Sequence, residues 1–282
     1  DATTLEQTSK IQAIVLDKTG TLTEGKPKVT EMVVAEGRTI EEVIGLAATA
    51  EKKSSHPISG AILEEAKKRK VNAEGSASDF EAIGGHGLRA VVQGKDILSG
   101  TEKLMQDRNI SLDALRTEID RLLASGNTIS IIAIDGVVAG VIGVADQIKP
   151  TAKKAIMGMQ ALGLEVAMIT GDHEQVAKAI AKELGIKRYF AQVLPEDKAK
   201  YVKKLQDEKK FVAMVGDGVN DAPALAQADI GIAIGAGTDV AIETANIVLM
   251  KSDPADILAA IKLSKATVTK MKQNLFWAAI YN

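Results

Sequence analysis

Three short apolar runs in the chain lead into acidic residues. They are "IQAIVLDKTG" (11–20), "LEVAMITGDH" (164–173) and "KFVAMVGDGVND" (210–221). A carboxylate at the end of a strand can attack a phosphoryl group and form an acyl phosphate. The attack of one anion on another needs charge neutralisation, which Mg²⁺ and a lysine commonly provide. These patterns predict phosphoryl chemistry with Asp17 as the nucleophile.

The other runs supply partners for this chemistry. Asp217 and Asp221 offer the oxygen ligands that Mg²⁺ requires. Thr170, with the amide of Gly171 and its neighbours, can hold phosphate oxygens, and Lys198 in "LPEDKAK" can balance their charge. A lone aspartate at a strand end is more often a helix cap, and a lone lysine is more often a solvated surface residue. The ordered combination therefore carries the prediction.

The elements that must position these residues are strands alternating with helices. Helical patterns, "PTAKKAIMGMQALG" and "PEDKAKYVKKLQDEKK", precede the second and third runs, which indicates βαβ units and a parallel sheet. Ligands of such sheets bind beyond the carboxyl ends of the strands, where the strand order reverses. We expect the acidic groups to meet there. "ADIGIAIG" and "ANIVLM" read as further buried strands, joined by a short helix in "AGTDVAIETA".

A different pattern lies between residues 30 and 148. Two helices (about 40–53 and 57–70) lead into a hairpin in "FEAIGGHGLRAVVQGKDILSG", followed by a helix near 111–125. Another hairpin, in "TISIIAIDGVVAGVIGVAD", turns at Asp135-Gly136. We predict an inserted α+β domain, with an antiparallel sheet and helices. The chain would enter and leave it at "EGKPKVT" and "ADQIKP".

Composition excludes several classes of protein. The 282 residues suggest two domains of ordinary size, with 46% hydrophobic and only 3% aromatic residues. A formal net charge of −2 gives no general attraction to nucleic acid, so we expect no nucleic-acid partner. The absence of cysteine excludes disulfides and thiolate chemistry.

The last residues are apolar and aromatic. "NLFWAAIYN" (274–282) follows the basic stretch "KATVTKMK" and resembles the start of a membrane helix, although nine residues cannot span a bilayer, which takes about 20. The alternative is an amphipathic helix docked on the protein.

"DKTGTLT", "TGD" and "MVGDGVNDAPAL" together resemble the signature of P-type ATPases, whose phosphorylation domain is of the haloacid dehalogenase type. "SSHP" (54–57) and "GHG" (85–87) resemble the nucleotide-binding domain of the heavy-metal-transporting branch. The resemblance implies an α/β fold, a Rossmann-like phosphorylation domain with an inserted α+β nucleotide-binding domain. The expected bounds are 1–29 and 149–260 for the phosphorylation domain, 30–148 for the nucleotide-binding domain and 261–282 for a C-terminal helix.

The resemblance also implies roles for individual residues. Asp17 would be phosphorylated, and Thr19 would bind the metal through its main-chain carbonyl. The remaining catalytic positions would be Thr170, Gly171, Asp172 and Lys198, with Asp217, Asn220 and Asp221 in the Mg²⁺ cluster. The ATP-binding positions would be Glu51, His56, Gly85, Gly87 and Gly100, with His56 orienting the adenine. The family often has Glu at Ser55 and Asn at Thr101, so these departures bear on the strength of nucleotide binding.

One position separates this reading from a phosphatase of the same superfamily. Those enzymes generally carry a second Asp two residues after the nucleophile, as the acid and base. Here that residue is Thr19, so the aspartyl phosphate should persist. A silent nucleotide sensor is the other alternative, but Asp17, Lys198 and Asp217 are all present.

The resemblance further implies the cytoplasmic part of an integral membrane pump. Its actuator and transmembrane domains would be the partners of this chain, together with ATP and Mg²⁺. The final Tyr281-Asn282 resembles a pair in copper(I) pumps, so copper(I), with silver as its congener, is the expected ion, and a zinc or cadmium pump is the alternative. The ion would not bind to this part of the pump.

Overall fold

The chain forms two compact units in the computed structural model, which describes residues 2–71, 75–217, 221–235 and 243–281. The parallel-sheet unit comprises Asp1–Gly25 and Ile148–Asn282, and the inserted unit comprises Lys26–Gln147. The sequence predicts the boundaries between the units at 29/30 and 148/149. In the structure they fall at 25/26 and 147/148, inside the long strands β2 (Thr23–Val34) and β7 (Val137–Ile148).

Six parallel strands form the sheet of the first unit, in the order β12-β11-β10-β1-β8-β9. Their bounds are Ala13–Asp17 (β1), Glu165–Ile169 (β8), Arg188–Phe190 (β9), Val212–Gly216 (β10), Ile230–Ile234 (β11) and Ile247–Leu249 (β12). Every residue of β1, β10 and β11 is buried, because helices cover both faces of a parallel sheet. β12 is only half-buried, contrary to the prediction of a buried strand, because it lies at the edge.

The strand order reverses at β1. The chain continues from β1 to β8 and β9 on one side, and β10, β11 and β12 follow on the other. The carboxyl end of β1 is therefore the predicted ligand-binding position of this sheet.

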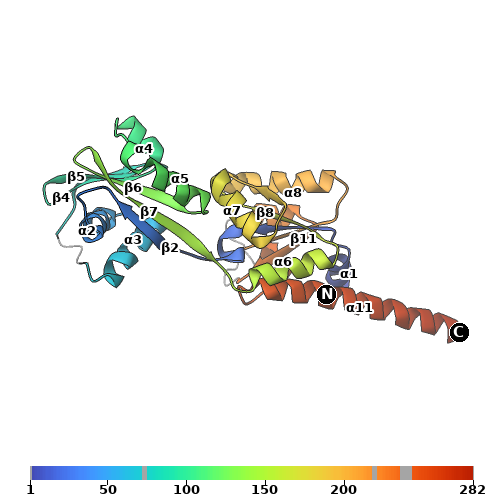
Figure 1. The fold of residues 1–282 in the computed structure, drawn as a ribbon. Coiled ribbons are helices and arrows are strands. Elements are labelled where there is room, and N and C mark those ends of the chain that lie inside the picture. The colour runs from blue at the N-terminus through green and yellow to red at the C-terminus, as the bar shows by residue number, and fades with distance from the viewer. Residues whose placement is uncertain (1, 72–74, 218–220, 236–242, 282) are drawn as a thin grey trace. The chain divides into compact units, whose positions relative to one another are not determined.

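Helices pack around this sheet (Figure 1). They are α1 (Ala2–Ser9), α6 (Ala152–Ala161), α7 (Glu174–Leu184), α8 (Lys198–Asp207), α9 (Ala222–Gln227) and α11 (Pro254–Tyr281). α7 buries Val176, Ile180 and Leu184, whose spacing of four places them on one helix face. It ends at Gly185 with φ +72°, the left-handed conformation that terminates many helices.

The two ends of the chain differ from the expectations. α1 was not predicted, and it packs against α11. α11 begins at Pro254 rather than at 261, because Asp253 Oδ1 accepts from Ala255 N at 2.9 Å and proline suits a first helical turn. Most of the helix expected in "AGTDVAIETA" (236–245) lies outside the described residues.

The far end of α11 exposes Leu275, Phe276, Trp277 and Ile280, so these side chains are not docked on the protein. No helix within the described ranges is both long enough and apolar enough to cross a membrane.

The inserted unit has a six-stranded sheet in the order β2-β7-β6-β5-β4-β3. The remaining bounds are Ser78–Ile83 (β3), Gly87–Val92 (β4), Lys95–Gly100 (β5), Thr128–Ile134 (β6), Ile40–Glu51 (α2), Pro57–Lys68 (α3), Glu102–Asp107 (α4) and Arg116–Ala124 (α5). The pairs from β7 to β3 are antiparallel, as predicted. Asp135 and Gly136 both have positive φ, 50° and 80°, which confirms the predicted two-residue turn. α4 was not predicted.

Neighbouring residues of β6 enter different cores. Ile132 packs in the core that contains residues of α2 and α3, whereas Ile131 packs with α4 and α5. Since successive side chains of a strand point to opposite faces, each face of the sheet carries one pair of helices.

Gly87 and Gly100 face each other across β4 and β5. A Cβ on Gly87 would lie 2.1 Å from Ser99 O and 2.6 Å from the Gly100 Cα, and one on Gly100 would lie 2.1 Å from His86 O. The close approach of two backbones therefore requires glycine at both positions.

We expect Gly87→Ala to lower the free energy of unfolding by about 3 kcal/mol, because the new methyl group meets backbone atoms that cannot rotate away and φ is +138°. Urea unfolding measures the change. Gly84→Ala is the matched control, because a Cβ there meets nothing within 4 Å. Equal stability of the two variants would contradict this packing.

Candidate active site

Asp17 ends β1, the strand at which the order of the sheet reverses, and only 5% of it is exposed. The chain then turns sharply through Lys18–Leu22, where Thr19 is extended and Gly20 has φ +76°. Thr19 is exposed in this turn. The predicted nucleophile thus lies at the predicted edge of the sheet, with Thr19 beside it on the solvent side.

Lys198 joins two acidic residues that are distant in sequence. Its Nζ lies 2.7 Å from Asp17 Oδ1 and 2.6 Å from Asp221 Oδ1, and all three residues are buried. Lys198 is the first residue of α8, so the start of that helix delivers the amine to the end of β1. The structure therefore brings together three of the residues that the sequence singles out.

Asp221 folds back on the end of β10. Its Oδ2 accepts from Asp217 N at 3.2 Å, and a Cβ on Gly216 would lie 2.1 Å from the same oxygen. Only glycine at 216 leaves room for this carboxylate, which explains the first glycine of "GDGVND". Asp217 follows β10 directly and is half-buried, whereas the predicted metal ligand Asn220 lies outside the described residues.

The Thr-Gly-Asp segment follows β8 at the same edge. Thr170 is buried, donates its hydroxyl to Asp172 Oδ2 at 3.0 Å and accepts from Asp172 N at 3.1 Å. Asp172 Oδ2 also lies 2.8 Å from Lys18 Nζ. Lys18 thus ties this segment to the turn after Asp17. Lys18 was not predicted as a site residue, although a buried lysine directly after a strand needs an anionic partner.

Lys149 and Ser252 hold the turn from its other side. Lys149 is 7% exposed, and its Nζ donates to Gly20 O and Ser252 Oγ, both at 2.7 Å. Ser252 Oγ also donates to Gly20 O, at 2.8 Å. These residues were not predicted, and the only sequence signal was the lysine in "ADQIKP", at the return from the inserted unit.

Burial and negative charge dominate the electrostatics. Burial raises the pKa of Asp17, the carboxylates of Asp221 and Asp217 raise it as well, and Lys198 lowers it, so that the pKa of Asp17 is about 7 in the fold. Burial lowers the pKa of Lys198, but Asp17 and Asp221 outweigh this, so its pKa is raised overall. One buried ammonium thus faces several carboxylates.

This charge imbalance suits a divalent cation. Among the described residues no three acidic or histidine side chains form a ready metal cage. Mg²⁺, however, is commonly held by one or two carboxylates together with water and substrate phosphates. Asp17 and Asp217, with the main-chain carbonyl of Thr19, offer oxygen ligands of the required kind, so these residues fit the ion.

The candidate nucleotide residues gather within the inserted unit. Glu51 ends α2 and accepts from Ser59 Oγ and Ser99 Oγ, both at 2.5 Å. His56 is exposed and caps α3, its Nδ1 accepting from Ile58 N at 3.2 Å. Gly100 follows Ser99 and pairs with Gly87. Gly85 has φ +73° and open space where a Cβ would lie. At Gly87 and Gly100, by contrast, backbone packing within the inserted unit already excludes any larger residue.

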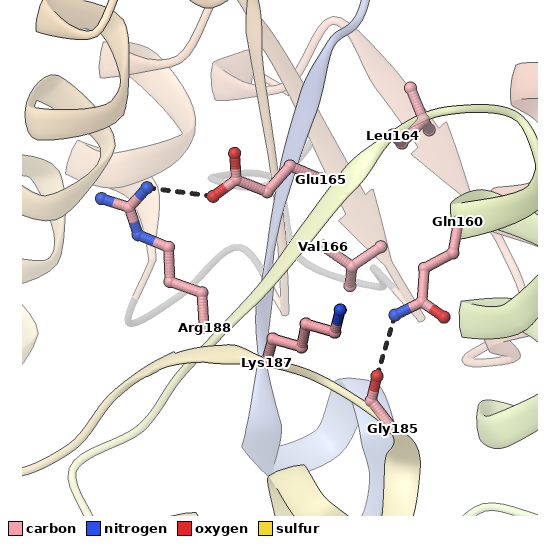
Figure 2. Close-up of a pocket in the computed structure, with 7 residues that line it drawn as sticks. All are labelled: Gln160, Leu164, Glu165, Val166, Gly185, Lys187 and Arg188. Carbon is pink, nitrogen blue, oxygen red and sulfur yellow. Dashed lines mark hydrogen bonds and ion pairs between the residues drawn. The ribbon is translucent and has the colours of Figure 1, made fainter.

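A hollow of about 490 Å³ lies at the opposite edge of the parallel sheet (Figure 2). Glu165 and Arg188, which begin β8 and β9, are paired in its wall, and Gln160 donates to Gly185 O at 2.9 Å. None of the predicted site residues lines it. It is therefore separate from the site around Asp17.

We expect Asp17→Asn to raise the free energy of unfolding in divalent-free buffer by about 4 kcal/mol at pH 8. The pKa of Asp17 is about 7 in the fold against 3.8 ordinarily, so the native state binds an extra proton between these values. Ionised Asp17 therefore lowers the free energy of unfolding progressively as pH rises from about 4 to about 7. Asparagine carries no charge, so the variant does not lose this stability. Unfolding at a series of pH values with EDTA measures it. Glu183→Gln, an exposed exchange, is the control, and a pH-independent difference would contradict the effect.

Comparison with known proteins identifies the family of this chain. The haloacid dehalogenase-like hydrolase family matches residues 11–229. Copper-exporting P-type ATPase B of Archaeoglobus fulgidus is 46% identical over the whole chain, and the copper-exporting P-type ATPase of Bacillus subtilis is 47% identical over 99% of it. The chain spans only 40% and 34% of the lengths of these relatives.

Solved structures give the same picture. A zinc-transporting PIB-type ATPase in its E2.Pi state matches 96% of this chain and 44% of its own, with a TM-score of 0.81 and 38% identity. The catalytic domain of the CPx-ATPase CopB-B, from a study of changes on nucleotide binding, matches 93% of this chain and 94% of its own, with a TM-score of 0.73 and 31% identity. The chain therefore belongs to the haloacid dehalogenase-like hydrolases and, within them, to the catalytic domains of P-type ATPases.

Proposed function

We propose that this chain binds ATP and phosphorylates itself on Asp17, as the catalytic part of a copper(I)-exporting P-type ATPase. The observation that carries the proposal is the buried Lys198 between Asp17 and Asp221, at the point where the strand order reverses. The copper-exporting relatives support the choice of ion.

In the proposed reaction, Asp17 attacks the γ-phosphorus of ATP in line. A bond forms between a carboxylate oxygen and phosphorus, the bond to the β–γ bridging oxygen breaks, and ADP leaves. Lys198 supplies positive charge to the phosphoryl oxygens, and Thr170 with the amide of Gly171 binds them. Asp172 and Lys18 hold these two loops in position.

Mg²⁺, held by Asp17, Asp217, Asn220 and the Thr19 carbonyl, would supply further neutralisation of the phosphate charge. Asp221, bonded to Lys198, would act by fixing the amine. We place ATP in the inserted unit, near Glu51, His56, Gly85, Gly87 and Gly100.

The remaining steps belong to parts of the pump outside this chain. We propose an actuator domain that hydrolyses the phosphoenzyme and transmembrane domains that carry copper(I), with this chain on the cytoplasmic side. A zinc pump is the second candidate, supported by the zinc-transporting structure at 38% identity. The Tyr281-Asn282 pair lies outside the residues whose side chains are described.

Incubation with Mg²⁺ and ATP should place a hydroxylamine-labile phosphate on Asp17, because Lys198 Nζ lies 2.7 Å from Asp17 Oδ1 and can neutralise part of the phosphoryl charge. Acid-quenched mass spectrometry maps it, with Asp17→Asn as the control. Phosphate release measured in parallel should be slow. Rapid hydrolysis of small phosphomonoesters with no trapped intermediate would make the chain a phosphatase instead.

Thr19→Asp should speed phosphate release from the phosphoenzyme by about 100-fold, because it adds a carboxyl group at the exposed position where phosphatases carry their acid and base. Thr19→Asn is the matched control, equal in size but unable to transfer a proton. Single-turnover decay of the labelled intermediate measures both. An unchanged decay in Thr19→Asp would show that the missing acid does not explain the persistence of the phosphate.

A further inference from the structure

Lys149 is a buried cation bonded twice to the turn that follows Asp17. Its Nζ donates to Gly20 O at 2.7 Å, and its main-chain amide donates to Leu22 O at 2.9 Å. Burying an ammonium group costs free energy unless new hydrogen bonds replace those to water. An apolar side chain would fill the same space without that cost. The bonds to the turn are therefore what this lysine supplies.

The turn has the backbone geometry of a type II β-turn. Thr19 has φ −74° and ψ 124°, and Gly20 has φ 76° and ψ −16°, close to the values of the two central residues of such a turn. The second central residue needs a positive φ, which glycine adopts without strain. Glycine also rotates more freely than any other residue, so contacts from outside the turn must hold Gly20 in one orientation.

Different residues hold the two ends of this turn. At its start, Lys18 O accepts from Thr23 N and also from Thr23 Oγ1, at 3.1 Å. Further along, Gly20 O accepts from Lys149 Nζ and from Ser252 Oγ. Thr23 belongs to the same stretch of chain, whereas Lys149 and Ser252 come from distant parts of it. The last two therefore fix the position of the turn within the parallel-sheet unit.

We propose that Lys149 is a positioning residue for the phosphorylation of Asp17. By holding Gly20 O, it restrains the peptide group between Thr19 and Gly20, which carries the carbonyl proposed to bind Mg²⁺. In this role Lys149 acts through the turn and does not touch the reacting atoms. The inference rests on the proposed function, autophosphorylation by ATP.

The charge of Lys149 does not account for this role. The main influences on the pKa of Asp17 are burial and the charged side chains of Asp221, Lys198 and Asp217. Lys149 is not among them. Its effect on the nucleophile is therefore expected to come from the position of the turn and not from its electric field.

The first test uses the whole chain without nucleotide. Lys149→Met keeps the length of the side chain but removes the donor. We expect amide hydrogen exchange at Thr23, whose N–H bonds to Lys18 O, to quicken about tenfold, because the turn opens more often. Ser252→Ala removes the other donor to the same oxygen and keeps the charge of Lys149, so exchange should quicken less but in the same direction.

Lys153→Met, an exposed change on α6, is the control for this exchange measurement. Its exchange at Thr23 should match that of the unaltered chain. Unchanged exchange in both Lys149→Met and Ser252→Ala would overturn the inference.

The second test follows single-turnover phosphorylation of Asp17 over a range of ATP concentrations with Mg²⁺. A small misplacement of reacting groups can slow a reaction about 100-fold, so we expect Lys149→Met to lower the maximal rate by about that factor and Ser252→Ala by about fivefold. The ATP concentration for half-saturation should not change, because the residues proposed to bind ATP lie in the inserted unit. An unchanged maximal rate, or a change confined to half-saturation, would overturn the inference.

Urea unfolding separates a loss of position from a loss of the fold. If Lys149→Met does not fold, Ser252→Ala decides alone, since it changes the same hydrogen-bonded oxygen and retains the lysine. If the unaltered chain takes no phosphate from ATP, the proposed function fails. The exchange measurement then still decides whether Lys149 holds the turn.

Discussion

The site around Asp17 depends on the buried ammonium group of Lys198. Lys198 holds two carboxylates that would otherwise repel each other in a region from which water is excluded. Removing one partner of a buried ion pair leaves an uncompensated charge, which commonly costs about 3 to 5 kcal/mol. The ends of β1 and β10 and the start of α8 can therefore converge only with the lysine in place. The remaining repulsion among the carboxylates is unfavourable, and binding of a divalent cation can relieve it.

The parallel sheet could be predicted because its strands are apolar on both faces. β1, β8 and β10 are runs that alternate with helices, and a polar group at the end of each run marks the same edge. The contacts among Asp17, Lys198 and Asp221 follow from that topology. Lys149 and Ser252 could not be found in this way, because they are about a hundred positions apart and meet through one carbonyl oxygen, a contact with no periodic signal.

The inserted unit shows a different limit. A motif identifies positions and does not state what each side chain does there. Gly87 and Gly100 are predicted ATP-binding positions, and the structure adds a packing reason for glycine at both, because the two backbones approach each other closely. Glu51 is also a predicted ATP-binding position, and the structure adds hydrogen bonds from Ser59 of α3 and Ser99 of β5, which no sequence pattern indicates. α4 was missed for a related reason: six residues are too few for helical periodicity to emerge.

The hydrogen bonds that Lys149 and Ser252 donate to Gly20 O connect the turn after Asp17 rigidly to the first turn of α11. Lys149 and Ser252 grip the same oxygen, and the neighbouring Asp253 caps α11 while it accepts from Thr151 at 2.6 Å. α11 has 28 residues, which at about 1.5 Å per residue gives a rod of roughly 42 Å. A displacement of this turn by chemistry at Asp17 would therefore move the first turn of α11, because these hydrogen bonds connect the two segments directly. The helix would transmit that movement along its length.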